Sequence, residues 1–146
     1  MLDNYQDLIE GLTATPSKLR ELLGDPVPDD VSDEARSLLA ELCNREKVEV
    51  RRVQVVMRDR KARLRPIQYE PEVTDPSSEP DEPEAMLQVF NNERSELISL
   101  LVNLTLRDWD QKVDHDEKGE IALADEIDDH LTWDEDMQER FETMLA

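Results

Sequence analysis

The chain has 146 residues, in which 37 acidic residues outnumber 17 basic ones, and its formal net charge is −20. This length favours a single domain. So negative a chain repels polyanions, which argues against nucleic acid or an anionic membrane surface as a partner. No apolar run approaches the roughly 20 residues that span a bilayer. The only cysteine, Cys43, can form no disulfide within the chain, so we expect a protein of the reducing cytoplasm.

The first helix is predicted over residues 2–23, where apolar residues recur at helical spacing. Pro16 interrupts this pattern and leaves two alternatives open. Either one long helix bends at Pro16, or a second helix begins there with Thr15 as its N-cap. Gly24 and the two prolines that follow it predict the end of the helical segment.

A long second helix is predicted from about residue 33 to about residue 64. Ser32 is a good N-cap, and the two acids after it favour the first turn because the helix dipole attracts negative charge. Residues 41–52 are unusually polar, and the valines between residues 48 and 56 partly alternate, so a strand is the competing prediction. The absence of Gly and Pro favours the helix.

Residues 66–83 contain five of the eight prolines, and their composition predicts a linker. A third helix is predicted over residues 84–104, a loop around a tryptophan over residues 105–120, and a fourth helix over residues 122–145. The prediction is therefore all-α: a four-helix bundle with a long crossover between helices two and three. The whole chain, residues 1–146, forms this one domain.

The residue types that carry chemistry are few. Cys43 follows a leucine on an apolar helix face, which favours a buried, inert thiol over a nucleophile. The two histidines, His115 and His130, are too few for a three-histidine zinc site within one chain. No Walker loop and no G-x-S-x-G sequence is present. The sequence by itself therefore predicts no reaction.

Three polar residues fall on or beside apolar helix faces. Asp134 lies in the inward register of the last helix, Gln138 follows it by one turn, and Glu41 lies near the apolar face of the second helix. A carboxylate that faces the core is costly unless it is paired or binds a metal. The alternatives are therefore a metal site, a salt bridge, or simple exposure at the edge of the apolar face. Four arginines are candidate partners for the salt bridge: Arg45, Arg52, Arg94 and Arg140.

The order of these features resembles that of the DinB/YfiT-like superfamily of bacterial four-helix bundles. The similarity is carried by residues 14–23, 40–66, 93–111 and 119–131 together with His115, and it covers nearly the whole chain. It implies an antiparallel bundle with an unusual order of helices, a metal site between the second and fourth helices, and often a homodimer. Characterised members include metal-dependent enzymes that transfer low-molecular-weight thiols and an isomerase that uses such a thiol.

The resemblance also implies where the metal ligands lie. The three histidine positions of the family correspond to Glu41, Asp134 and Gln138, with Trp133 as the marker on the last helix. All three imidazoles are thus replaced by oxygen donors, which suit zinc poorly. We expect a degenerate metal site, no cofactor and a binding or structural role. The alternative is a weakly bound divalent cation (Mn, Mg, Ca or Ni) that serves a thiol transferase or hydrolase.

Other expectations concern partners. The resemblance implies a homodimer, and a small molecule is a further candidate ligand. An interaction protein of a stress response is a third hypothesis, suggested only by the family's name.

The acidity is either an adaptation to a high-salt interior, where self-repulsion is screened, or a property of an ordinary acidic protein.

Charge is unevenly distributed along the chain. Residues 45–65 contain nine basic residues and three acids, a net of +6. The favoured interpretation is that these bases pack beside acidic neighbours within the bundle. The alternative is that they contact an anion or a nucleic acid.

Overall fold

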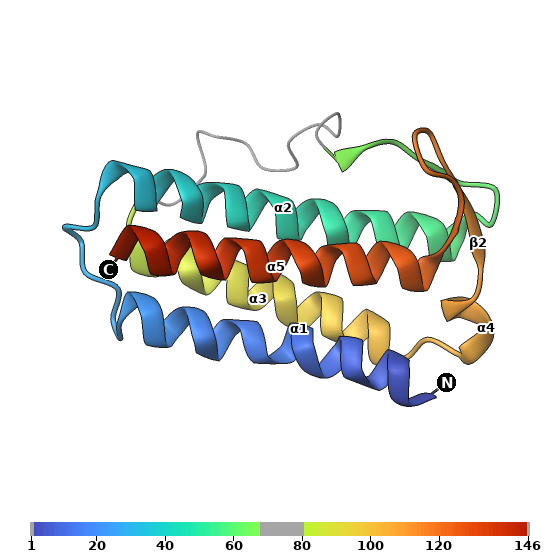
Figure 1. Ribbon diagram of the computed structural model, residues 1–146, viewed down its shortest axis with the longest axis horizontal. Helices are drawn as coiled ribbons and strands as arrows, with labels where there is room; N and C mark the ends of the chain where they lie inside the picture. The colour runs from blue at the N-terminus through green and yellow to red at the C-terminus, as the bar shows by residue number, and fades with distance from the viewer. Residues whose placement is uncertain (1, 68–80, 146) are drawn as a thin grey trace.

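The computed structural model describes residues 2–67 and 81–145, which are mostly helical, as predicted. Four long helices lie side by side, and a short helix and a small sheet lie at one end of them (Figure 1). The helices are α1 (Leu2–Leu23), α2 (Asp33–Arg58), α3 (Pro83–Val102), α4 (Leu106–Trp109) and α5 (Leu123–Leu145). The strands are β1 (Arg63–Leu64), β2 (Lys112–His115) and β3 (Gly119–Ala122). None of these helices has the length and apolar character needed to cross a membrane.

The long helices run in two directions. Figure 1 shows α1 and α5 running one way and α2 and α3 the other. The most extensive packing is between α2 and α3 and between α1 and α5, so the closest neighbours are parallel rather than antiparallel as expected. Parallel neighbours cannot be joined by a tight turn, because the chain must return along the length of the helices. The connection between α2 and α3 is accordingly long. Most of the linker predicted over residues 66–83 lies outside the described residues.

Helix α1 continues through Pro16, so the one-helix alternative is correct. Proline has no backbone N–H, and the carbonyl four residues earlier therefore loses its helical donor. That carbonyl belongs to Leu12, which is fully buried. A buried carbonyl must find another donor, and the one it finds lies on a different helix, as described below.

Helix α2 begins where predicted but ends earlier. The Ser32 hydroxyl accepts a hydrogen bond from the backbone N–H of Ala35 at 3.1 Å, which confirms the predicted cap. The helix ends at Arg58 rather than near residue 64, and residues 63–64 form β1. This strand pairs in parallel with β2, placing Leu64 opposite His115. The pairing supplies the backbone hydrogen bonds that a further helical turn would have made.

The loop predicted over residues 105–120 is more ordered than expected. Thr105 and Asp108 form a reciprocal capping box that starts α4. A hairpin of β2 and β3 follows, and Gly119 adopts a φ of 77° at its turn. The segment Lys-Val-Asp-His alternates between exposed and buried, which is the strand signal that the prediction of a loop overlooked.

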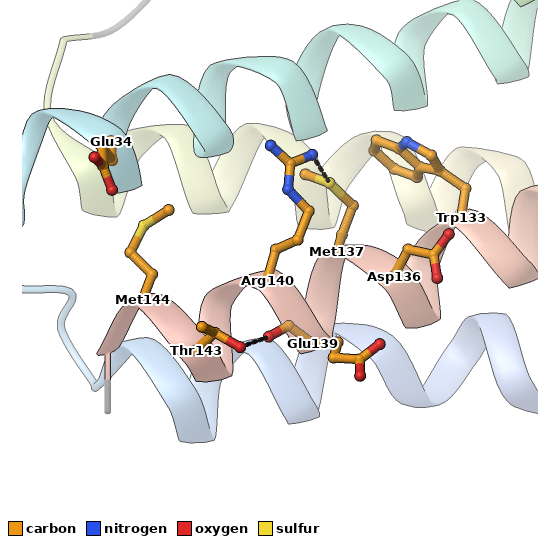
Figure 2. Close-up of a pocket in the computed structure, with 8 residues that line it drawn as sticks. All are labelled: Glu34, Trp133, Asp136, Met137, Glu139, Arg140, Thr143 and Met144. Atoms are coloured by element: carbon orange, nitrogen blue, oxygen red, sulfur yellow. Dashed lines mark hydrogen bonds between the residues drawn. The ribbon is translucent and has the colours of Figure 1, made fainter.

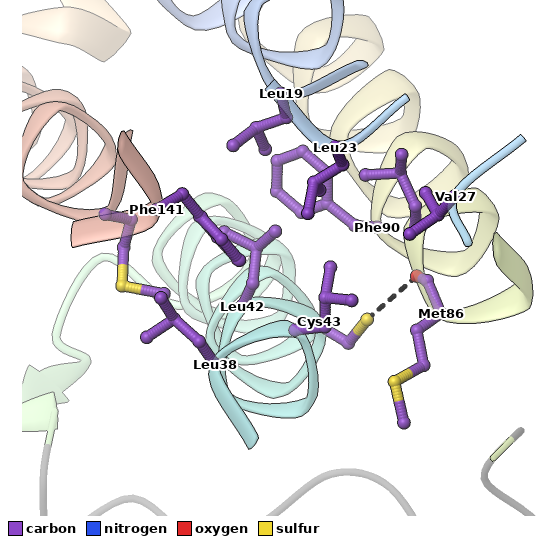
Figure 3. Close-up of a cluster of buried hydrophobic side chains, with 12 residues drawn as sticks. Leu19, Leu23, Val27, Leu38, Leu42, Cys43, Met86, Phe90 and Phe141 are labelled. Carbon is purple, nitrogen blue, oxygen red and sulfur yellow. Dashed lines mark hydrogen bonds between the residues drawn. The ribbon is translucent and has the colours of Figure 1, made fainter. Parts of the chain in front are cut away.

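The core consists of two large apolar clusters along the bundle. Figure 3 shows one of them, where Leu19, Phe90 and Phe141 meet from three helices. Cys43 is fully buried in this cluster, as predicted, and its thiol contacts the carbonyl oxygen of Met86 at 3.0 Å. The second cluster lies nearer the hairpin and includes Leu12, Leu97 and Ile127. A polar region separates the two.

Substitution of Gly119 tests the hairpin. Gly119→Ala should lower the free energy of unfolding by about 1–2 kcal/mol, because an L-residue is strained at positive φ. The added methyl group meets no atom within 4 Å, so strain is the only cost. Gly119→Asn should lose less, since Asn tolerates this conformation better. Urea denaturation measures both, and equal losses would contradict the explanation.

Candidate functional site

Between the two apolar clusters lies a layer of buried polar side chains to which all four long helices contribute. We call five of its members the central network: Thr15, Glu46, Arg94, His130 and Asp134. Each of them is at most 1% exposed. On every helix the polar residue falls between residues of the two apolar clusters, so the layer is closed on both sides.

Arg94 on α3 is the centre of the network. Its Nε and Nη2 atoms donate to the two carboxylate oxygens of Glu46 on α2, at 2.7 and 2.8 Å. Its Nη1 and Nη2 atoms donate to the two oxygens of Asp134 on α5, both at 2.7 Å. One guanidinium thus forms two bidentate salt bridges, the strongest hydrogen-bonding geometry that an arginine can offer to carboxylates.

Helix α1 joins the network through its proline. Arg94 Nη1 also donates to the Leu12 carbonyl at 2.8 Å, the carbonyl that Pro16 leaves without a helical donor. Thr15 supplies the second contact, since its hydroxyl donates to Asp134 Oδ2 at 2.7 Å. Pro16 therefore leaves the Leu12 carbonyl free to accept a hydrogen bond from Arg94, and Thr15 donates one to Asp134.

His130 connects this network to a second group of buried charges. Its Nε2 atom lies 2.8 Å from Glu46 Oε1, and its Nδ1 atom lies 3.5 Å from Glu49 Oε1. Among the described residues, neither His130 Nδ1 nor the Glu49 carboxyl has a hydrogen-bond partner of good geometry. We call Glu49, Arg52 and Glu126 the Glu49 cluster.

Within the Glu49 cluster, Arg52 donates hydrogen bonds to two neighbouring residues. Its Nη2 atom donates to Glu126 Oε1 at 2.7 Å, and its Nη1 atom donates to the Arg65 carbonyl at 2.7 Å. Burial opposes the charge of Glu126, but the hydrogen bond and charge of Arg52 prevail and lower the pKa of Glu126. Burial and repulsion from Glu126 raise the pKa of Glu49 well above its usual value. Of the two carboxyl groups, Glu49 is therefore the one that keeps its proton to the higher pH.

The charges of the central network stabilise one another. Burial alone would raise the pKa of Glu46, but its electrostatic interactions and hydrogen bonds with His130 and Arg94 outweigh burial and lower the pKa to about 2. Burial likewise disfavours charge on Arg94, and the two carboxylates reverse this and raise its pKa above the usual value. The ion pair between Glu46 and Arg94 is therefore fully formed at neutral pH.

The structure brings together only part of the predicted site. Asp134 is fully buried, and Gln138 lies at the edge of the network, 3.5 Å from the Thr15 hydroxyl. Glu41, in contrast, has a side chain that is 53% exposed and lies 3.8 Å from Arg140. The carboxylate of α2 that reaches the network is Glu46. Glu46 follows the buried Leu42 by four residues and shares its face, whereas Glu41 precedes Leu42 by one and points about 100° away.

The salt-bridge alternative for Asp134 is correct, and Arg94 is the partner among the four arginines considered. Sequence reasoning missed Glu46 and His130, although a signal for each exists. The buried positions of α2 recur every three or four residues from Ala35 to Val56, and Glu46 and Glu49 fall within that register. His130 follows Ile127 by three residues and precedes Asp134 by four, in the buried register of α5.

The same residues include a candidate set of metal ligands. Glu46, His130 and Asp134 each offer one ligand atom, and these atoms lie within 4.8 Å of one another. One imidazole and two carboxylates suit a divalent transition metal. The guanidinium of Arg94, however, lies 2.7–2.8 Å from the oxygens of both carboxylates. It stands where a cation would bind, so these residues do not fit a metal while Arg94 remains in place.

Glu41 lies on the surface, beside a groove along α5. The groove has a volume of about 660 Å³. Figure 2 shows residues that line it, among them Trp133, Met137 and Met144 and the acidic residues Glu34, Asp136 and Glu139. Glu41 lines an adjoining hollow together with Leu38 and Arg140. Arg140 spans the two, and its Nη1 atom contacts Met137 Sδ at 3.6 Å. The groove is open to solvent and wide enough to hold a small molecule.

Comparison with known proteins adds no assignment. No protein-family model matches the chain, and searches among curated proteins and solved structures found no match. The interpretation of the site therefore depends on its own geometry.

Replacement of the central arginine tests the network. Arg94→Met should lower the free energy of unfolding by about 3–5 kcal/mol, because it leaves two buried carboxylates without their partner. The matched control is Arg140→Met, since Arg140 is 55% exposed and makes a 3.8 Å ion pair with Glu41 and a 3.6 Å contact with Met137 Sδ. Its effect should stay within about 0.5 kcal/mol. Comparable losses in urea denaturation of the two variants would contradict the central role of Arg94.

The proton on Glu49 predicts a pH-dependent effect. A raised pKa in the folded state stabilises the protein below the unfolded-state pKa, and this stabilisation is lost as pH rises toward the folded-state value. Glu49→Gln has no proton to lose, so its stability relative to the wild type should increase from about pH 5 upward. Chemical denaturation at pH 4, 6 and 8 measures this trend. The exposed-site variant Glu41→Gln should show no such trend, and a flat profile for Glu49→Gln would refute the assignment.

Proposed function

We propose that this chain is a divergent DinB/YfiT-like bundle in which an arginine has taken the place of the metal ion, and that it acts as a binding or structural module. The observation that carries the proposal is the pair of bidentate salt bridges from Arg94 to Glu46 and Asp134. The order of the four long helices and the long connection between α2 and α3 support the family relationship.

Burial of the network supports a role without metal catalysis. A catalytic metal keeps a coordination position open for water or substrate. The five members of the central network are almost completely inaccessible, and an apolar cluster lies on either side of them. A thiol substrate has no approach to this layer. Binding is therefore assigned to the surface of the bundle, where the groove beside α5 and smaller cavities are accessible.

Charge also favours the arginine over a metal. Glu46 and Asp134 together carry two negative charges, and Arg94 satisfies both while remaining hydrogen-bonded to α1. A divalent cation in the same layer would be repelled by the guanidinium at a distance where little solvent screens the interaction. The proposal further includes the homodimer that the family resemblance implies and the cytoplasmic location that the single cysteine suggests.

The second candidate function is a metal-dependent transferase or hydrolase. It is favoured by one observation, the convergence of Glu46, His130 and Asp134 within 4.8 Å. These three residues would hold the ion in place of the predicted Glu41 and Gln138. The candidate requires Arg94 to leave its four hydrogen bonds with the carboxylates, and it therefore makes a prediction opposite to that of the first proposal.

Thermal unfolding with added metal separates the two candidates. The melting temperature of the wild-type protein should not respond to Mn²⁺, Ni²⁺ or Zn²⁺, because the guanidinium blocks the ligand atoms. Arg94→Ala removes the guanidinium, and metal should then stabilise this variant by about 2.7 kcal/mol at a concentration of 100 Kd. The control is Arg94→Ala combined with Asp134→Ala, which should not respond.

The wild-type measurement decides the matter even if the variants are unstable. Protein purified without chelator should contain well under one equivalent of transition metal. A full equivalent, or a metal-dependent rise in the wild-type melting temperature, would refute the arginine-for-metal proposal and support the enzyme.

A further inference from the structure

A small cavity of about 130 Å³ lies at the hairpin end of the molecule, where α2 and α5 approach β2. Its lining includes three basic residues, Arg45, Arg52 and Lys118, and the imidazole of His115. We propose that this cavity binds a small oxyanion, a phosphate or a short carboxylate, between Arg45 and His115. The inference rests on the proposed binding role and provides a ligand class for it.

Arg45 is the only one of the three bases whose charge has no partner among the described residues. Its Nε atom is buried without a hydrogen bond, and no described carboxylate forms a salt bridge with it. Burial lowers the pKa of Arg45, with Glu49 and Glu126 acting against this from a distance. An unpaired guanidinium is unexpected in a chain with 37 acidic residues. A half-buried cation of this kind gains most from an anion that enters the cavity.

The other charges that line the cavity are already matched. Arg52 forms a bidentate pair with Glu126, and Lys118 pairs with Asp129. Glu117 also lines the cavity, but it is exposed, and solvent and salt screen its charge. Of the three bases in the cavity, Arg45 is therefore the one without a salt bridge to a described carboxylate, and Glu46, Glu49 and Glu126 act on its charge only from a distance.

His115 provides a second donor in a fixed orientation. Its Nδ1 atom accepts hydrogen bonds from the backbone N–H groups of Glu117 and Lys118, at 3.1 and 3.2 Å. An Nδ1 that accepts must be unprotonated, so the ring carries its proton on Nε2. His115 is 5% exposed, and its strand lies between β1 and β3, which holds the ring in place. Nε2–H is thus the donor that His115 offers to the cavity.

The position of Arg45 is also fixed before a ligand binds. Its guanidinium carbon lies 4.8 Å from the centre of the Trp133 ring, and this stacking orients the planar group. A planar guanidinium matches the two oxygens of a carboxylate or phosphate. The volume of about 130 Å³ is below the 300–1,000 Å³ typical of sites for drug-sized ligands, so the occupant must be small.

Trp133 makes the proposal measurable. In a Trp109→Phe background, Trp133 is the only tryptophan, and an anion at Arg45 should change its fluorescence. We expect saturable changes with inorganic phosphate, with acetate or with both, at a constant ionic strength set with chloride. A response to phosphate alone assigns a phosphate ligand, and a response to acetate alone assigns a carboxylate ligand. Calorimetry on the wild-type protein provides a check that is independent of the tryptophan substitution.

Matched variants define the result that would overturn the inference. Arg45→Gln should weaken binding at least tenfold, and Arg45→Lys, which keeps the charge but not the fork, should weaken it less. Arg140→Gln is the control and should bind like the wild type. No saturable response to either anion, or equal affinity in Arg45→Gln, would refute the anion site. Neither outcome affects the metal test at Arg94, so failure of this inference is distinguishable from failure of the proposed function.

Discussion

The structure depends on one guanidinium. Arg94 of α3 hydrogen-bonds to Glu46 of α2, to Asp134 of α5 and to the Leu12 carbonyl of α1, so a single side chain connects all four long helices. A buried ion pair is not in itself a strong source of stability, because desolvation offsets much of the attraction. Its value here lies in specificity. Any arrangement that separates the four partners leaves charges buried and unpaired, which costs far more than a lost apolar contact.

This constraint organises the packing on both sides of it. The two apolar clusters alone would tolerate sliding of one helix along another, since leucines and valines are interchangeable contacts. The polar layer between them removes that freedom, because only one register places Arg94 opposite both carboxylates. Pro16 contributes to the same polar layer. Its missing N–H would normally weaken a helix, and here it provides a buried acceptor for the guanidinium.

Two arginines, Arg94 in the interior and Arg45 nearer the surface, differ in their burial and in their partners. Arg94 is buried, and its guanidinium forms hydrogen bonds with both carboxylates. Arg45 is half-buried, stacked on Trp133 and without a salt bridge among the described residues. The two side chains thus define complementary roles, one in holding the bundle together and the other in recognition of an oxyanion. His130 lies between the two regions, because it touches Glu46 and also stacks on Trp133.

The sequence by itself determined the four long helices, the cap at Ser32, the buried thiol of Cys43 and the inward position of Asp134, because apolar spacing and capping are local properties. It did not distinguish Glu41 from Glu46, nor did it identify the hairpin at residues 112–122. Pairing across a sheet and between helices depends on which segments meet, and no local pattern records that. Only the tertiary structure decided that Arg94 is the partner of Asp134. The choice among the arginines depends on how far the four helices are shifted along their axes relative to one another. Those shifts are set by the positions at which the buried charges can pair.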